Sequence, residues 1–235
     1  MSEAQGARDH QGVHQHGHQH HGSGPGDEAS SEAFWDQRYR SSSKVWSGQA
    51  NPQLVAEASE LAPGTALDVG CGEGADAIWL AEQGWRVTAV DVSGVALERG
   101  AAHALEVGAE LAGRITWLRA DLAEWVPSSA SYDLVSAQFM HLPKDQREVL
   151  HGRLAQAVVP GGTLLVVGHH PSDLLTTVPR PPTPGLLFTA AEVADSLPAG
   201  QWVTRVDEAR ARQTPDPDGR TVTIHDAVLR AERVS

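Results

Sequence analysis

The chain has 235 residues, 40% of them hydrophobic, and a formal net charge of −12 from 18 basic and 30 acidic side chains. This length predicts one domain with a tail, and the hydrophobic content is sufficient for a core. The acidic balance argues against a nucleic acid partner, because affinity for nucleic acids comes largely from neutralising phosphates. It argues equally against an anionic membrane surface.

Three further features bear on where the protein works. The sequence contains no run of 18 or more apolar residues, so we expect no membrane-spanning helix. Its start lacks the basic and apolar pattern of a secretion signal. Cys71 is the only cysteine, so an intrachain disulfide is impossible. This cysteine usage fits a reducing compartment, and we expect a cytoplasmic protein.

Residues 1–30 are rich in Gly, Gln, Ser and His, which predicts a disordered tail. Half of the 12 histidines lie there: His10, His14, His16, His18, His20 and His21. Flexible imidazoles can chelate Ni²⁺, Zn²⁺ or Cu²⁺, but no cysteine completes a defined site. A divalent metal on the tail and a soluble tail with incidental metal affinity both stay open, and we assign no metal ligand.

The segment 31–62 precedes the core and is predicted to hold two helices. The first spans Glu32 to Arg40 and carries aromatic residues on one side. The second begins with Asn51 as N-cap and Pro52 in the first turn, and it continues to about Leu61.

The stretch 66–74 reads Ala-Leu-Asp-Val-Gly-Cys-Gly-Glu-Gly, a short buried strand that runs into a glycine-rich loop. Gly70, Gly72 and Gly74 let the backbone turn sharply and approach a ligand without a Cβ in the way. The next strand ends in Asp91, at the carboxyl edge where open α/β sheets bind ligands. An acid at this point can accept hydrogen bonds from both hydroxyls of a ribose.

Strands and helices alternate through the core. Strands are expected near 65–70, 86–91, 115–120, 132–138 and 162–168, and helices near 74–83, 94–107 and 144–158. The alternation predicts an α/β fold with a parallel sheet and helices on both of its faces.

The C-terminal part contains a different pattern. Residues 171–187 include five prolines and are predicted to form an irregular loop or lid over the pocket. Thr189 and Glu192 have the spacing of a capping box and begin a helix. The segments 202–212 and 221–230 alternate around a turn rich in Pro, Asp and Gly, so they should form a closing hairpin.

Two cofactor classes use a glycine loop followed by a strand-end acid. The dinucleotide fingerprint G-x-G-x-x-G/A is matched loosely by Gly70, Gly72 and Ala75. However, Asp68 stands beside the loop, where its carboxylate would repel a pyrophosphate but suit the ammonium of an amino acid. S-adenosylmethionine has that ammonium, a sulfonium and no phosphate, so the residues favour it over NAD.

The segment 66–74 resembles motif I of class I S-adenosylmethionine-dependent methyltransferases. The likeness continues in order over about residues 50–170. Residues 119–122 (Arg-Ala-Asp-Leu) match the adenine-edge motif, 132–138 the fourth strand, and 159–167 the turn into the fifth strand. The resemblance implies a Rossmann-like doubly wound sheet, mostly parallel, with an antiparallel C-terminal hairpin and strand order 3-2-1-4-5-7-6.

The aromatic residues before the core carry a second resemblance. Trp35 and Tyr39 on the first helix, followed by Trp46, are similar to the N-terminal lid of the thiopurine and tellurite-resistance methyltransferases, which folds over the cofactor. This implies a methyltransferase domain at 31–235 with a helical lid at 31–62. Ordinary packing of an amphipathic helix is the alternative.

The family resemblance also implies which residues bind the cofactor. They are Tyr39, Trp46, Asp68, Gly70, Gly72, Gly74, Asp91, Val92, Asp121, Leu122 and Gln138. In this assignment Asp68 lies near the methionine ammonium, Asp91 binds the ribose and Val92 packs on the adenine. Asp121 and the residue after it meet the adenine edge, and Gln138 faces the methionine portion. A role for Asp121 as a turn residue or helix cap stays open.

The candidate residues for contact with the methyl acceptor are histidines. His141 follows the fourth strand, where class I enzymes place substrate-facing groups, and its ordinary pKa suits a general base. A capping or pocket-lining role for His141 is the alternative. His169 and His170 end the fifth strand on the same rim, but adjacent strand residues point to opposite faces, so we expect one to be structural.

We therefore predict an S-adenosylmethionine-dependent methyltransferase that acts on a small molecule. Soft acceptors such as a thiol or a selenium or tellurium oxyanion need little help from a base. Arsenite methylation requires several cysteines, and an NAD-dependent oxidoreductase would need a proton-relay pair such as Tyr-x-x-x-Lys. The alternative is a non-catalytic module that binds S-adenosylmethionine or a metal. No motif predicts the acceptor itself or the oligomeric state.

Overall fold

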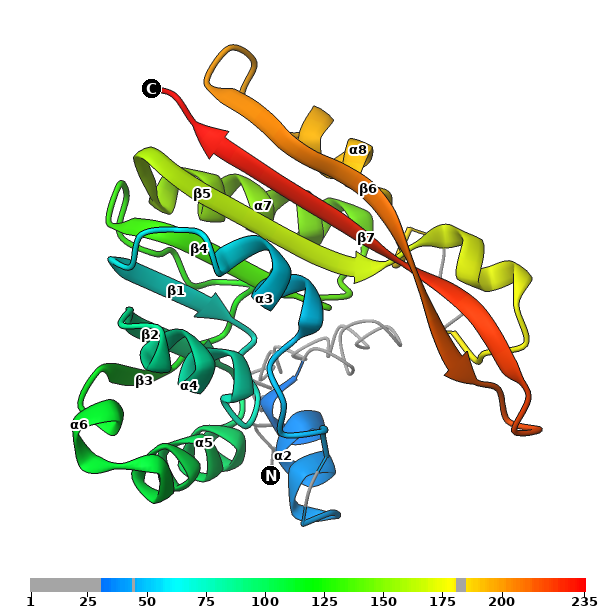
Figure 1. Ribbon diagram of the computed structural model, residues 1–235, viewed down its shortest axis with the longest axis horizontal. Coiled ribbons are helices and arrows are strands. Elements are labelled where there is room, and N and C mark those ends of the chain that lie inside the picture. Colours follow the sequence, from blue (N-terminus) through cyan, green and yellow to red (C-terminus); the bar gives the residue numbers. More distant parts are fainter. Residues whose placement is uncertain (1–30, 44, 181–184) are drawn as a thin grey trace, which may run out of the picture.

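The computed structural model describes residues 31–43, 45–180 and 185–235, so the predicted tail at 1–30 lies outside the described residues. A seven-stranded sheet with the order β3-β2-β1-β4-β5-β7-β6 forms the centre of the fold (Figure 1). Its strands are β1 (Thr65–Val69), β2 (Arg86–Asp91), β3 (Ile115–Arg119), β4 (Tyr132–Gln138), β5 (Val158–His169), β6 (Trp202–Pro215) and β7 (Thr221–Arg233). The predicted α/β class and strand order are confirmed.

The pairing of the strands follows from their connections. The five strands β3, β2, β1, β4 and β5 pair in parallel. The last strand, β7, pairs antiparallel with both β5 and β6. The sheet is therefore mostly parallel with an antiparallel C-terminal hairpin, and the carboxyl ends of the parallel strands meet at one edge.

The helices cover both faces of this sheet. They are α2 (Glu32–Arg40), α3 (Pro52–Ala58), α4 (Ala75–Glu82), α5 (Gly94–Val107), α6 (Ala109–Ala112), α7 (Lys144–Ala157) and α8 (Ala190–Asp195), with a 3₁₀ turn η1 (Pro171–Leu175). Leu67 and Val69 pack into a core cluster with α7 and α8. Ala66 points to a second cluster with α3 and α4. The parallel strands are apolar because both of their faces are buried.

Two helix starts are capped as the sequence predicts. The Asn51 Oδ1 accepts the Gln53 N–H at 2.9 Å. The Thr189 Oγ1 accepts the Glu192 N–H at 3.2 Å, and the Glu192 carboxylate accepts the Thr189 N–H at 2.8 Å. Helix α3 ends at Ala58, so the predicted end near Leu61 is too late.

The start of the fifth strand differs from the prediction. The predicted helix extends to residue 158 and the predicted strand begins at 162, whereas β5 already begins at Val158. The reason is that Val158 is buried and pairs with Tyr132, with a register irregularity between Tyr132 and Leu134. The Pro-Gly-Gly sequence at 160–162 lies inside the extended segment instead of preceding it.

The predicted lid segment at 31–62 divides into two parts. Helix α2 and the loop after it lie beside α5 and the glycine loop (Figure 1). Helix α3 instead packs on the sheet, where the Leu54 side chain is fully buried. Glu57 on α3 forms ion pairs with Arg210 at 2.5 Å and Arg230 at 3.3 Å on the C-terminal hairpin. The first part therefore lies against the glycine loop and the second part against the sheet.

Residues 171–180 of the proline-rich segment are more ordered than predicted. They begin with η1, whose Asp173 side chain is fully buried. One Asp173 oxygen accepts the His225 N–H at 2.8 Å and the other pairs with Arg180 at 2.8 Å. This buried ion pair joins residues 171–180 to β7. Among the described residues, no helix is long and apolar enough to cross a membrane.

Candidate active site

The glycine loop after β1 turns in a conformation that favours glycine. Gly70, Gly72 and Gly74 have φ angles of 70°, 53° and 81°. A Cβ added to Gly72 would lie 2.9 Å from the Tyr39 hydroxyl. The Gly70 N–H donates to the Val90 carbonyl at 2.8 Å, which fixes the loop against β2. The backbone thus comes close to whatever lies at the carboxyl edge.

Asp91 ends β2 beside this loop. Its side chain is buried, and its two oxygens accept the Gly72 N–H and the Ser93 N–H, each at 2.9 Å. Burial raises the pKa of Asp91, and the two backbone donors partly offset that rise. Because both oxygens are fixed by backbone groups, their remaining lone pairs have a defined direction at the sheet edge.

Asp68 and Gln138 contribute two buried oxygens that lack a hydrogen-bond partner. Asp68 is 1% exposed and its Oδ2 is unpartnered, as is the Gln138 Oε1. Asp68 pairs in register with Ser136, whose Oγ accepts the Gln138 Nε2 at 2.8 Å, so the two residues approach one region. Burial, with the carboxylates of Asp76 and Asp91, raises the pKa of Asp68. Such an unpaired acceptor pair is costly unless a donor ligand binds there.

Aromatic residues of α2 and the loop after it stand over the glycine loop. The Trp46 Nε1 donates to the Tyr39 hydroxyl at 2.9 Å, and the Trp35 ring lies 6.1 Å from Tyr39 and 6.4 Å from Trp46. Tyr39 is 2% exposed. Burial, with the carboxylates of Asp91 and Glu73, raises the pKa of Tyr39, so the hydroxyl keeps its proton and can donate it.

The three residues predicted to contact adenine differ in how deeply they are buried. Val92 is half-buried directly after Asp91. Leu122 is buried in the core cluster that contains Val90. Asp121 is exposed and its Oδ1 accepts the Ala123 N–H at 2.9 Å. This Asp121 contact has the geometry of the turn role that the sequence analysis leaves open.

On the acceptor side, Phe139, His141 and His169 form a stack. The His141 and His169 rings lie 4.7 Å apart at 13°, and Phe139 lies 4.8 Å from His169. The His141 Nε2 accepts the His169 backbone N–H at 3.2 Å. Burial, followed by the charges of Arg180 and Arg147, lowers the pKa of His141 to about 4. The ring is therefore neutral at pH 7, and one nitrogen is already engaged.

The two adjacent histidines at the end of β5 have different neighbours, as strand geometry predicts. His169 faces the stack, and its buried Nδ1 is unpartnered. His170 caps η1: its Nδ1 accepts the Ser172 N–H at 3.2 Å and lies 2.9 Å from the Ser172 hydroxyl. His170 is thus the structural member of the pair.

Several polar contacts at this edge were not predicted. The Asp36 Oδ1 on α2 accepts the Ser93 hydroxyl at 2.6 Å, and the Asn51 N–H donates to Asp76 at 2.6 Å. Glu73 inside the glycine loop pairs with Arg99 at 2.9 Å. These partners are 57, 25 and 26 positions apart in the sequence, and no local pattern joins them.

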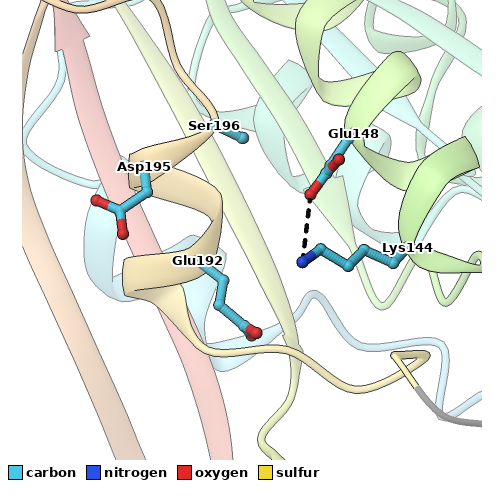
Figure 2. Close-up of a pocket in the computed structure, with 5 residues that line it drawn as sticks. All are labelled: Lys144, Glu148, Glu192, Asp195 and Ser196. Carbon is cyan, nitrogen blue, oxygen red and sulfur yellow. Dashed lines mark ion pairs between the residues drawn. The ribbon is translucent and has the colours of Figure 1, made fainter.

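Two hollows in the described part of the structure can be defined by their lining residues. A cavity of about 380 Å³ lies between α7 and α8, lined by Lys144, Glu148, Glu192, Asp195 and Ser196 (Figure 2). In it the Lys144 Nζ lies 3.8 Å from Glu148. A groove of about 660 Å³ runs along the outer side of α4 and α5 and reaches Glu73. Within the described part of the chain, no three His, Cys, Asp or Glu side chains gather as a metal site.

Part of the chain is similar to known methyltransferases. Residues 66–162 match the family described as "Methyltransferase domain". An uncharacterized methyltransferase of Mycobacterium tuberculosis is 39% identical over 102 residues, which cover 43% of this chain and 48% of that protein. The chain thus spans about half the length of the curated relatives it matches.

Solved structures share the fold. One, described as "Conversion of a Disulfide Bond into a Thioacetal Group during Echinomycin Biosynthesis", has a TM-score of 0.67 at 21% identity and covers 86% of this chain and 91% of that one. TehB from Haemophilus influenzae has a TM-score of 0.62 at 20% identity and covers 86% and 66%. The chain therefore shares the fold of these structures, and its residues 66–162 are similar to a methyltransferase domain.

Proposed function

We propose that this protein binds S-adenosylmethionine at the carboxyl edge of its sheet and methylates a small molecule. The observation that carries the proposal is the pair of buried, unpartnered oxygens on Asp68 and Gln138, next to the fixed carboxylate of Asp91. Buried acceptor atoms without partners fit an ammonium group, because an ammonium has only hydrogen-bond donors and no acceptor.

The remaining cofactor contacts follow from the placement of each residue. Asp91 would accept both ribose hydroxyls, while Val92 and Leu122 would flank the adenine. Asp121 would meet the adenine edge through the oxygen that its turn leaves free. Gly70, Gly72 and Gly74 would allow close approach of the backbone. In this proposal Tyr39 and Trp46 complete the site from the lid, 31–62, and the methyltransferase domain comprises 31–235.

When bound, S-adenosylmethionine supplies a methyl group that its sulfonium already activates. The protein's task is then to orient the acceptor and exclude water. His141 is our candidate for a base, but its low pKa makes it a weak one, and its Nε2 must first release the His169 N–H. A weak base suits acceptors that ionise readily, such as a thiol or a selenium or tellurium oxyanion. This acceptor range underlies the proposed kinship with the tellurite-resistance and thiopurine enzymes.

An acceptor screen tests the proposal. Purified protein is incubated with S-adenosylmethionine and thiols, thiopurines, tellurite or selenite, and S-adenosylhomocysteine is measured. We expect turnover with at least one soft acceptor, and a His141→Gln variant that retains much of it. If the variant loses all activity, His141 is a true base and harder acceptors become favoured. Cofactor binding with no turnover on any acceptor would support the non-catalytic alternative.

A further inference from the structure

Glu73 is a buried acid in the glycine loop with no role in the assignments above. Its side chain is 8% exposed. One oxygen, Oε2, accepts the backbone N–H groups of Val45 at 3.2 Å and Trp46 at 3.3 Å. The other oxygen, Oε1, accepts the Arg99 Nη1 at 2.9 Å. Glu73 therefore ties the loop after α2 to α5.

Arg99 extends this connection to the end of α2. Its Nη2 donates to the Tyr39 carbonyl at 2.7 Å. One carboxylate and one guanidinium therefore hold the backbone of both Tyr39 and Trp46. The side chains of those two residues hydrogen-bond to each other at 2.9 Å above Gly72.

We propose that Glu73 is a positioning residue that, with Arg99, places Tyr39 and Trp46 over the amino-acid end of the cofactor. This inference rests on the proposed cofactor site. The Tyr39 hydroxyl accepts from Trp46, so its own proton is available for an anion. The only anionic group of S-adenosylmethionine is its carboxylate. Glu73 acts through Tyr39 and Trp46 rather than by contact with the cofactor.

Because Glu73 is charged and buried, its ion pair is a poor source of fold stability, which favours a role in positioning Tyr39 and Trp46. Burying an ion pair costs desolvation that roughly cancels its attraction, so such pairs contribute little net stability. Helix α2 also has an independent anchor, because the Asp36 carboxylate accepts the Ser93 hydroxyl at 2.6 Å. Loss of Glu73 should therefore disturb Tyr39 and Trp46 locally while α2 and the fold remain.

Binding calorimetry on Glu73→Gln tests the proposal, with Glu82→Gln as the matched control. Glu82 is an exposed acid at the end of α4, so the control makes the same charge change without these contacts. We expect Glu73→Gln to bind S-adenosylhomocysteine at least tenfold more weakly than wild type. Its affinity for 5′-methylthioadenosine, which lacks the amino-acid end, should stay unchanged. Equal losses for both ligands, or no loss for either, would overturn the proposal.

A double-mutant cycle adds a second criterion. Because Glu73 and Arg99 act as one unit, Arg99→Met should give a similar loss, and the double variant should be no worse than either single variant. Fully additive losses would show two independent effects and would contradict the shared role.

Limited trypsin digestion separates this inference from the cofactor assignment. Arg38 and Arg40 are exposed on α2. Without any cofactor, we expect faster cleavage there in Glu73→Gln than in Glu82→Gln, because the end of α2 and the loop after it lose the contacts of the Glu73 carboxylate. If the wild type binds no sulfur cofactor, the proposed function fails. The digestion still tests whether Glu73 and Arg99 hold the end of α2 and the loop after it. Equal cleavage rates in the two variants would refute it.

Discussion

Asp68 is the residue whose environment conflicts most with its charge. Its carboxylate is buried, one oxygen has no partner, and two further acids raise its pKa. Such a group is retained at a cost in stability when it serves a ligand. We therefore expect Asp68 to lower the stability of the fold and to raise the affinity for the cofactor.

We predict that Asp68→Asn weakens S-adenosylhomocysteine binding by about 10- to 100-fold, the loss expected for one hydrogen bond to a charged group. The free energy of unfolding should stay the same or rise, because a buried charge is removed. Calorimetry and chemical denaturation measure the two quantities.

Asp133→Asn is the control, and it should change stability but not cofactor affinity. Asp133 accepts the Thr65 N–H at 2.7 Å at the far end of β1. Its loss should lower the free energy of unfolding by about 1 kcal/mol and leave cofactor affinity unchanged. If both variants lose affinity alike, the special role of Asp68 is refuted.

Candidate residues could be picked out from the sequence where a local pattern places them at the sheet edge. Asp68, the three glycines and Asp91 could be singled out because a strand, a turn and a second strand follow one another in the sequence. The contacts of Glu73 with Arg99 and of Asp36 with Ser93 could not, since they form only after helices distant in the chain have packed.

At the scale of elements, a buried ion pair helps to attach residues 171–180 to the sheet. Asp173 is fully buried and its partner Arg180 is 11% exposed. Prolines limit backbone freedom but do not fix a segment to the sheet. The Asp173 contacts supply that attachment.

We predict that Asp173→Asn lowers the free energy of unfolding by about 3 kcal/mol, because removal of one partner leaves Arg180 buried and unpaired. Proteolysis within 171–180 should become faster. Arg180→Met should cost at least as much as Asp173→Asn, since it leaves the more deeply buried charge of Asp173 without its cation. Denaturant titration of both variants checks the order, and the reverse order would argue against this account of the segment.

Elements were predicted best where their signals are local. The caps at Asn51 and Thr189 and the limits of α5 follow from residue types within one turn. The start of β5 was missed because Pro-Gly-Gly at 160–162 is typical of a turn, whereas pairing of Val158 with Tyr132 depends on a strand that is distant in the sequence.

At the scale of the whole molecule, one buried and two half-buried histidines make stability depend on pH. Burial is the main cause that lowers the pKa of His141 and His151 to about 4 and of His169 to about 3. In the unfolded chain these groups take up protons near pH 6.5. Their contribution to stability is therefore complete above about pH 6.5 and is lost as the pH falls towards 4.

Buried carboxyls act in the opposite direction. Burial raises the pKa of Asp76 to about 6, so its contribution is present at low pH and is lost as the pH rises from about 4 to 6. A single variant separates the two effects, because groups that are unchanged cancel in the comparison with wild type.

His151→Leu is that variant. His151 is 2% exposed with an unpartnered Nε2, and it lies away from the proposed site, edge-on to Phe188. Between pH 6.5 and 4.5 the free energy of unfolding should fall less steeply in the variant, by up to about 1.4 kcal/mol per pH unit. Parallel curves for the two proteins would show that His151 does not titrate on unfolding.

The measurement that tests the central claim most directly is calorimetric titration of the protein with S-adenosylmethionine, S-adenosylhomocysteine and NAD, repeated on Asp91→Ala. We predict micromolar binding of both sulfur cofactors, none of NAD, and much weaker binding in a variant that is still folded. Unchanged affinity in the variant would contradict the ribose placement. Failure of wild type to bind either sulfur cofactor would contradict the proposed function itself.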